Sequence, residues 1–89
     1  MQLFQLQAFK RRVKRLYPNQ KEALDRAIAE LLDNPALGQA KKADLAGVHV
    51  YKFHMAGQRT LLAYQYDRNE LVLMALGDHE NFYRDLKRS

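Results

Sequence analysis

The apolar residues of this 89-residue chain change their spacing once, near Gly38. Before this glycine they recur every three or four residues, which is the spacing of a helix with one apolar face. After it they alternate with polar residues or run together, as they do in half-buried and fully buried strands. Helices in the first part and strands in the second predict an α+β domain, in which the helices cover one face of a sheet.

Two helices are predicted before the change of spacing, and together they form an αα-hairpin. The first covers residues 6–17 and ends at Pro18 and Asn19, because proline lacks an N–H and disfavours helix in the residue before it. The second begins near Gln20 and is closed by the Asp-Asn-Pro sequence at 33–35. The apolar stripes are Leu6, Phe9, Val13, Leu16 and Tyr17 in the first helix and Leu24, Ala27, Ile28, Leu31 and Leu32 in the second.

Three strands are predicted after the change of spacing, at 48–55, 59–66 and 71–76. The segments 56–58 and 67–69 between them have the length and composition of hairpin turns, so the strands are expected to pair as an antiparallel meander. The last strand is apolar on both faces, which predicts that it is covered on both sides.

The two ends of the chain complete the predicted fold. Residues 1–4 are a candidate for a short edge strand, and residues 81–88 are expected to form a short terminal helix or tail. The length leaves room for a single domain, 1–89. The prediction is an α+β domain with an N-terminal helix hairpin packed on a small antiparallel sheet.

The composition excludes several classes of protein and favours a polyanionic partner. Lys and Arg number 15 against 10 Asp and Glu, a net charge of +5, which favours nucleic acid, an acidic protein or both. The chain has no cysteine, so disulfide scaffolds, zinc ribbons and thiol catalysis are excluded. Ser89 is the only serine, which leaves no serine triad, and no glycine-rich phosphate loop is present.

Neither a metal nor another cofactor is expected. The three histidines, His49, His54 and His79, are not paired four residues apart on a predicted helix. No apolar run reaches the length of a membrane span, and the first residues lack the order of a signal peptide. The expected location is the cytoplasm.

Candidate nucleic-acid contacts gather in two basic segments. Five of the six residues at 10–15 are basic, and like charges four residues apart destabilise a helix, which indicates that they serve a purpose. Phosphate contacts supply much of the affinity of nucleic-acid binders, so a contact surface for RNA or DNA is predicted, with a solvated helix face as the alternative. The candidates are Lys10, Arg11, Arg12, Lys14 and Arg15 in the helix, and Lys41 and Lys42 in a predicted loop before the first strand.

Five residues are candidates for acid–base chemistry around one sheet face. Lys52 and His54 lie two residues apart on a strand and therefore project the same way. Arg59 opens the next strand and is expected diagonal to His54 across the turn. His79 follows the third strand, and Tyr83 lies beside it if that segment is helical. Such a cluster can bind a phosphodiester and move protons; the alternative is an exposed polar face with structural histidines.

Four segments follow the helix hairpin in a recognisable order. They are Asp44-Leu45-Ala46-Gly47, Val50-Tyr51-Lys52-Phe53-His54, Leu61-Leu62-Ala63-Tyr64 and Gly77-Asp78-His79-Glu80-Asn81-Phe82-Tyr83. This order resembles the RelE/ParE superfamily of type II toxin–antitoxin toxins over most of the chain. The most specific match, Gly77-x-His79-x-x-x-Tyr83, is similar to the ending of catalytic, ribosome-dependent members. Their central strand often has an arginine where this chain has Leu61, and Arg59 lies two residues earlier on the same strand face.

The resemblance implies a small toxin with one of several activities. RelE-like members resemble ribosome-dependent endoribonucleases, which cut mRNA in the A site. For such an enzyme, His54 or His79 is the expected acid or base, Lys52 and Arg59 stabilise the phosphate, and Tyr83 positions a base by stacking. ParE-like members instead poison DNA gyrase and keep no catalytic set, and a DNA-nicking toxin is a further alternative.

The resemblance also implies a cognate antitoxin as partner. A chain of net charge +5 with a basic helix favours an acidic, partly disordered segment that folds on binding. This segment is expected to cover the helix hairpin or to add a strand to an open sheet edge.

Overall fold

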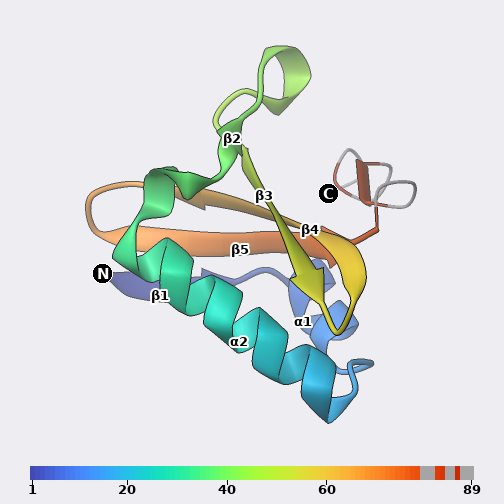
Figure 1. The fold of residues 1–89 in the computed structure, drawn as a ribbon. Helices are drawn as coiled ribbons and strands as arrows, with labels where there is room; N and C mark the ends of the chain where they lie inside the picture. The colour runs from blue at the N-terminus through green and yellow to red at the C-terminus, as the bar shows by residue number, and fades with distance from the viewer. Residues whose placement is uncertain (79–81, 84–85, 87–89) are drawn as a thin grey trace.

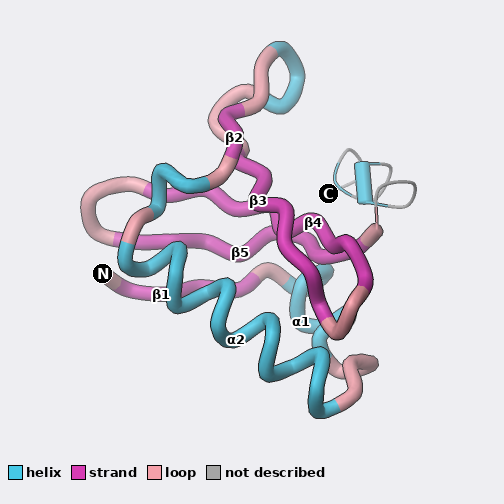
Figure 2. The backbone as a smooth tube through the Cα atoms, in the orientation of Figure 1, coloured by secondary structure: helices cyan, strands magenta, loops and turns pink. Residues whose placement is uncertain are grey.

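The computed structural model describes residues 1–78, 82, 83 and 86. Within them, two α-helices and two 3₁₀ turns accompany five strands that form one sheet (Figures 1 and 2). The helices are α1 (Gln7–Val13) and α2 (Pro18–Asp33), and the 3₁₀ turns span Pro35–Leu37 and Ala43–Leu45. The strands are β1 (Gln2–Gln5), β2 (Gln39–Ala40), β3 (His49–Met55), β4 (Gln58–Tyr66) and β5 (Glu70–Gly77).

The predicted α+β class is confirmed, and the predicted meander is β3-β4-β5. The sheet order is β1-β5-β4-β3-β2, so β1 and β2 extend the meander at its two edges. β1 confirms the candidate edge strand, but it pairs parallel with β5, so the sheet is mixed rather than antiparallel. Parallel pairing needs a long crossover, and the whole chain between β1 and β5 provides one. β2 has two residues, too few to show a period in the sequence.

The two helices meet at a different place from the predicted one. α1 ends at Val13 rather than at Tyr17, and Pro18 is the first residue of α2 instead of the break before it. Proline suits this position because the first helical N–H groups need no partner within the helix. Tyr17 N–H donates to Gln20 Oε1 at 2.8 Å, which caps the start of α2.

Both helices pack on one face of the sheet, here called the helix face, with α1 against β5 and α2 against β3 (Figure 1). Its buried core joins Phe9 of α1 to Leu24 of α2 and to Leu62, Leu71 and Leu73 of the sheet. No helix in the described part of the chain is long and apolar enough to cross a membrane.

The opposite face, here called the second face, has a separate apolar cluster. This cluster consists of Val48, Val50, Leu61, Ala63, Ala75, Phe82 and Leu86. Phe82 and Tyr83 are helical, and Phe82 N–H donates to Asp78 C=O at 3.1 Å, so a helical turn begins in the predicted C-terminal element. β5 therefore has buried apolar residues on both faces, as its sequence predicts.

Tyr64 fastens the segment after α2 to the sheet. Its hydroxyl donates to Pro35 C=O at 2.6 Å and accepts the Gly38 N–H at 2.8 Å. A Cβ atom at Gly38 would lie 2.5 Å from this hydroxyl oxygen, so glycine is required for the close approach. A second link joins β3 to α2, where the Tyr51 hydroxyl donates to Glu30 Oε2 at 2.5 Å and this hydrogen bond raises the pKa of Tyr51.

Replacing Tyr64 with phenylalanine is expected to destabilise the chain by about 1–3 kcal/mol, because the Pro35 carbonyl and the Gly38 N–H both lose their partner. Burial also raises the pKa of Tyr64 above its ordinary value of 10. Folding therefore favours the neutral hydroxyl, and the stability that this contributes is complete below pH 10 and is lost as pH rises through the raised pKa.

Chemical denaturation of the wild type and of Tyr64→Phe, at neutral pH and above pH 10, measures both effects. The variant is expected to be less stable at neutral pH and to lose less stability in alkali. Tyr66→Phe is the matched control, because it removes a hydroxyl from the same core without breaking a hydrogen bond between described residues. Equal losses in the two variants would contradict the role of the Tyr64 hydroxyl.

Candidate functional site

A two-residue turn joins β3 to β4 and sets the register of the candidate site. Ala56 and Gly57 have φ angles of +54° and +83°, the positive values of the tight turns that suit a hairpin. Met55 pairs with Gln58, so Gln58 belongs to β4 rather than to the turn. In consequence Arg59 lies directly opposite His54, which corrects the predicted diagonal position.

Three of the five predicted acid–base residues lie together at this end of the hairpin. His54 and Arg59 are a cross-strand pair, and Lys52 is two residues along β3, opposite the buried Leu61. Cross-strand partners share a face of the sheet, with Cβ atoms about 5 Å apart. Lys52, His54 and Arg59 are all exposed, and together they form what is called here the hairpin cluster, next to the apolar cluster of the second face.

Tyr83 packs on the same face but toward the other end of β3. It lies against the apolar cluster of the second face, and its ring centroid is 5.6 Å from Lys41 Nζ. The Lys41 N–H donates to the Val48 carbonyl at 2.9 Å, which places Lys41 beside the start of β3, whereas His54 is near its end. His79 lies outside the described residues.

The basic segment at 10–15 forms the last part of α1 and the residues after it. All five basic side chains are exposed. The prediction that like charges destabilise this segment assumed one long helix over residues 6–17. α1 instead ends at Val13, which places Lys10, Arg11 and Arg12 in its last turn. Cations are favourable there, because the helix dipole is negative at its C-terminal end.

The basic segment and the hairpin cluster lie at the same end of the sheet. Leu6 N–H donates to Leu73 C=O at 2.9 Å, so α1 starts alongside the second half of β5. Gly77, at the end of β5, pairs with Leu61 near the start of β4. Phe9 of α1 belongs to the same buried cluster as Met55, the last residue of β3. Lys42, which is exposed, lies in the segment between β2 and β3.

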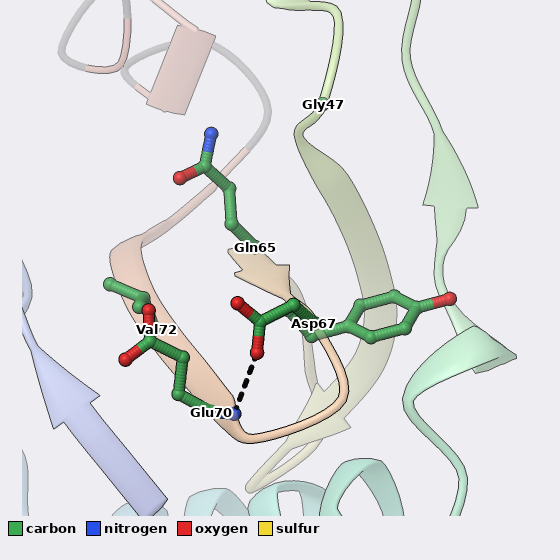
Figure 3. A pocket seen from close by; sticks show the side chains of 6 residues that line it. Gly47, Gln65, Asp67, Glu70 and Val72 are labelled. Atoms are coloured by element: carbon green, nitrogen blue, oxygen red, sulfur yellow. Dashed lines mark hydrogen bonds between the residues drawn. The ribbon is translucent and has the colours of Figure 1, made fainter.

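A polar pocket at the opposite end of the sheet is not evident from the sequence. It is lined by Gly47, Gln65, Tyr66, Asp67, Glu70 and Val72 (Figure 3). Asp67 Oδ1 accepts the N–H groups of Asn69 at 2.8 Å and Glu70 at 2.9 Å, so this carboxylate holds the β4–β5 turn. The Asp-Arg-Asn sequence of the turn is the local signal for such a structural role. Among the described residues, no group of three or more His, Asp or Glu side chains is arranged to hold a metal ion.

An apolar groove lies on the helix face beside the open edge of β1. It is lined by Leu3, Gln5, Phe9, Val13, Lys21, Leu24, Asp25, Ile28 and Leu73. Lys21 and Asp25 form an exposed ion pair at 3.0 Å, so the rim of the groove is polar. Leu3 is 40% exposed and its neighbour Phe4 is 45% exposed. β1 also lies at the edge of the sheet, so one side of its backbone has no partner strand. The groove and the edge together leave apolar surface and backbone groups available to a partner.

A protein-family model settles the family. The model for the ParE-like toxin of type II bacterial toxin–antitoxin systems matches residues 3–87. The chain belongs to this family. The predicted membership of the RelE/ParE superfamily is therefore confirmed. A comparison with curated proteins found no match to the sequence.

Solved structures of related toxins share the fold of this ParE-like toxin. A double mutant of Escherichia coli RelE in the free state is 16% identical, covers 98% of this chain and 90% of its own, and has a TM-score of 0.73. RelE in the intact E. coli RelBE complex is 17% identical over 89% of this chain and 96% of that one, with a TM-score of 0.70. A YoeB/ParE toxin from Agrobacterium tumefaciens is 17% identical, with coverage of 89% and 99% and a TM-score of 0.64. Identities this low establish the fold and not the activity.

Proposed function

We propose that this toxin is a ribosome-dependent endoribonuclease that needs no metal. The observation that carries the proposal is the direct pairing of His54 with Arg59, with Lys52 two residues away and all three side chains exposed on one face. An imidazole can transfer protons and two neighbouring cations can offset negative charge on a phosphorane, and both contributions serve metal-independent cleavage of a phosphodiester. The fold shared with RelE is consistent with this activity.

The cleavage uses the 2′-hydroxyl of RNA as nucleophile. A base takes the hydroxyl proton, the oxygen attacks the neighbouring phosphorus, and the bond to the 5′-oxygen breaks as an acid protonates that oxygen. His54 and His79 are the proposed acid and base, and Lys52 and Arg59 offset the charge on the phosphorane. Tyr83 stacks on a base of the mRNA. DNA lacks the 2′-hydroxyl, so the same residues suit RNA better.

The chemistry is tested by replacing the paired residues. Brief induction of His54→Gln or Arg59→Gln is expected to produce about 10²-fold less mRNA cleavage than the wild type, because each variant loses a proton-transfer or charge-stabilising group. Primer extension on cellular mRNA measures the cleavage, and breaks within codons, in frame, identify ribosome dependence. Arg26→Gln, a charge change on α2, is the control that should cleave normally.

DNA gyrase is the second candidate target, favoured by the ParE-like family model. Growth arrest with intact mRNA and loss of DNA supercoiling would contradict the ribonuclease proposal and support inhibition of gyrase. Full toxicity of folded His54→Gln and Arg59→Gln proteins would also count against the ribonuclease. Nicking of a supercoiled plasmid by purified protein, with and without EDTA, would indicate a DNA-nicking toxin instead. All of these targets are found in the cytoplasm, which is the location that the proposal implies.

The basic segment at 10–15 is the proposed contact for RNA, and the exposed Lys42 adds to it. Phosphate contacts make affinity fall with salt, so Arg11→Gln/Arg12→Gln/Arg15→Gln is expected to bind single-stranded RNA more weakly. The slope of log affinity against log salt should become shallower by about 0.7 for each phosphate group that the variant no longer neutralises. Fluorescence anisotropy at several salt concentrations measures this, with Arg26→Gln/Arg68→Gln as the control for charge removed elsewhere. An unchanged slope would identify the segment as a solvated helix face.

An acidic antitoxin is the proposed partner. The family description places the toxin in a toxin–antitoxin system, and E. coli RelE has been solved in complex with its antitoxin RelB. We place the antitoxin in the apolar groove between α1, α2 and β1, where a helix or an added strand would bury Leu3. α1 contributes Phe9 and Val13 to this groove, and the exposed basic residues between them in the sequence attract an acidic segment.

Replacing one residue of the groove tests this placement. Leu3→Glu is expected to weaken antitoxin binding at least tenfold, because a carboxylate replaces an apolar contact and repels an acidic partner. Leu37→Glu is the matched control, since Leu37 is 46% exposed and lies outside the groove. Stopped-flow association with the product of the neighbouring gene should also slow markedly as salt is raised. Equal affinities for the two variants, or a rate indifferent to salt, would contradict the placement.

A further inference from the structure

The segment between β2 and β3 folds over the second face of the sheet. Backbone hydrogen bonds close it on itself, from Leu45 N–H to Lys42 C=O at 3.2 Å and from Val48 N–H to Leu45 C=O at 3.0 Å. Leu45 packs against the apolar cluster that contains Phe82 and Leu86. The segment therefore covers part of the C-terminal residues, although it lies far from them in the chain.

Lys41 of this segment contacts Tyr83, one of the described C-terminal residues. Its Nζ lies 5.6 Å from the centroid of the Tyr83 ring, within the range of a cation–π interaction. The Phe82 ring meets the same tyrosine ring at 89°, with centroids 5.1 Å apart. Lys41 is half-buried and its own N–H is bonded to Val48, so its backbone is fixed relative to β3. Two neighbours thus restrict the plane of the Tyr83 ring.

We propose that Lys41 is a positioning residue for Tyr83, which it holds by a cation–π contact in the orientation that accepts an RNA base. This inference rests on the proposed ribonuclease function, in which Tyr83 stacks on the mRNA. It gives Lys41 a different role from the phosphate contact expected from the sequence. A lysine that binds phosphate acts on the substrate directly, whereas a positioning lysine acts only through the tyrosine.

The contact itself is tested without any activity. The ε-methylene protons of Lys41 in the purified full chain are expected to be shifted upfield by the Tyr83 ring, and the shift should disappear in Tyr83→Leu. Amide hydrogen exchange at Phe82, whose N–H is bonded to Asp78, should be faster in Lys41→Met than in the wild type. Methionine is chosen because it keeps the apolar stem of lysine and removes the charge. An unshifted Lys41 methylene in the wild type would overturn the proposal.

The functional consequence is tested by a double-mutant cycle on ribosome-dependent cleavage. Lys41→Met is expected to lower kcat about two- to fivefold, the size of effect that a part-exposed cation–π contact supports, and Lys41→Arg should restore it. In the Tyr83→Leu background, Lys41→Met should have no further effect. Arg68→Met, which removes one positive charge from the β4–β5 turn, is the control with normal cleavage.

The outcomes separate this inference from the function on which it rests. An effect of Lys41→Met that persists in Tyr83→Leu, or that appears in KM with a shallower salt dependence, would identify Lys41 as a phosphate contact and overturn the positioning role. A wild-type chain that cleaves no mRNA would overturn the ribonuclease proposal. In that case the chemical shift of Lys41 would still decide whether this residue holds Tyr83.

Discussion

The tight turn between β3 and β4 determines where the residues of the hairpin cluster lie. Both of its residues, Ala56 and Gly57, have positive φ, and alanine adopts this region only when the surrounding structure holds it there. The pairing of β3 with β4 on one side of the turn provides that support. Because side chains alternate between faces, a shift of one residue in this register would place Arg59 on the face opposite to His54.

The sheet keeps two kinds of surface apart. Its helix face is closed by α1 and α2 over a large apolar core, and the groove beside β1 is what remains open there. Its second face has a smaller apolar cluster, which leaves Lys52, His54 and Arg59 exposed at the hairpin end. A partner in the groove and a substrate on the second face would therefore contact opposite faces of the same sheet. Phe9 of α1 and Met55 at the end of β3 share the core of the helix face, so α1 lies on the side of the sheet opposite to the hairpin cluster.

Local patterns in the sequence are sufficient for part of the candidate site. They place Lys52 and His54 on one face correctly, because residues two apart on a strand always share a face. They place Arg59 diagonal to His54, whereas in the structure it lies directly opposite. The sequence does not show that the turn has only two residues, with Ala56 at positive φ. The contact between Lys41 and Tyr83 has no sequence signal at all, because it joins segments that are distant in the chain.

The sequence by itself determined the α+β class, the basic character of the chain and the absence of thiol chemistry. These follow from spacing and composition, which are properties of neighbouring residues and of the chain as a whole. Only the tertiary structure decided that β1 pairs parallel with β5, that Tyr64 requires glycine at position 38, and that Arg59 faces His54. The reason is physical: periodicity reflects local backbone geometry, whereas register and long-range contacts depend on how distant segments pack, and no local pattern encodes that packing.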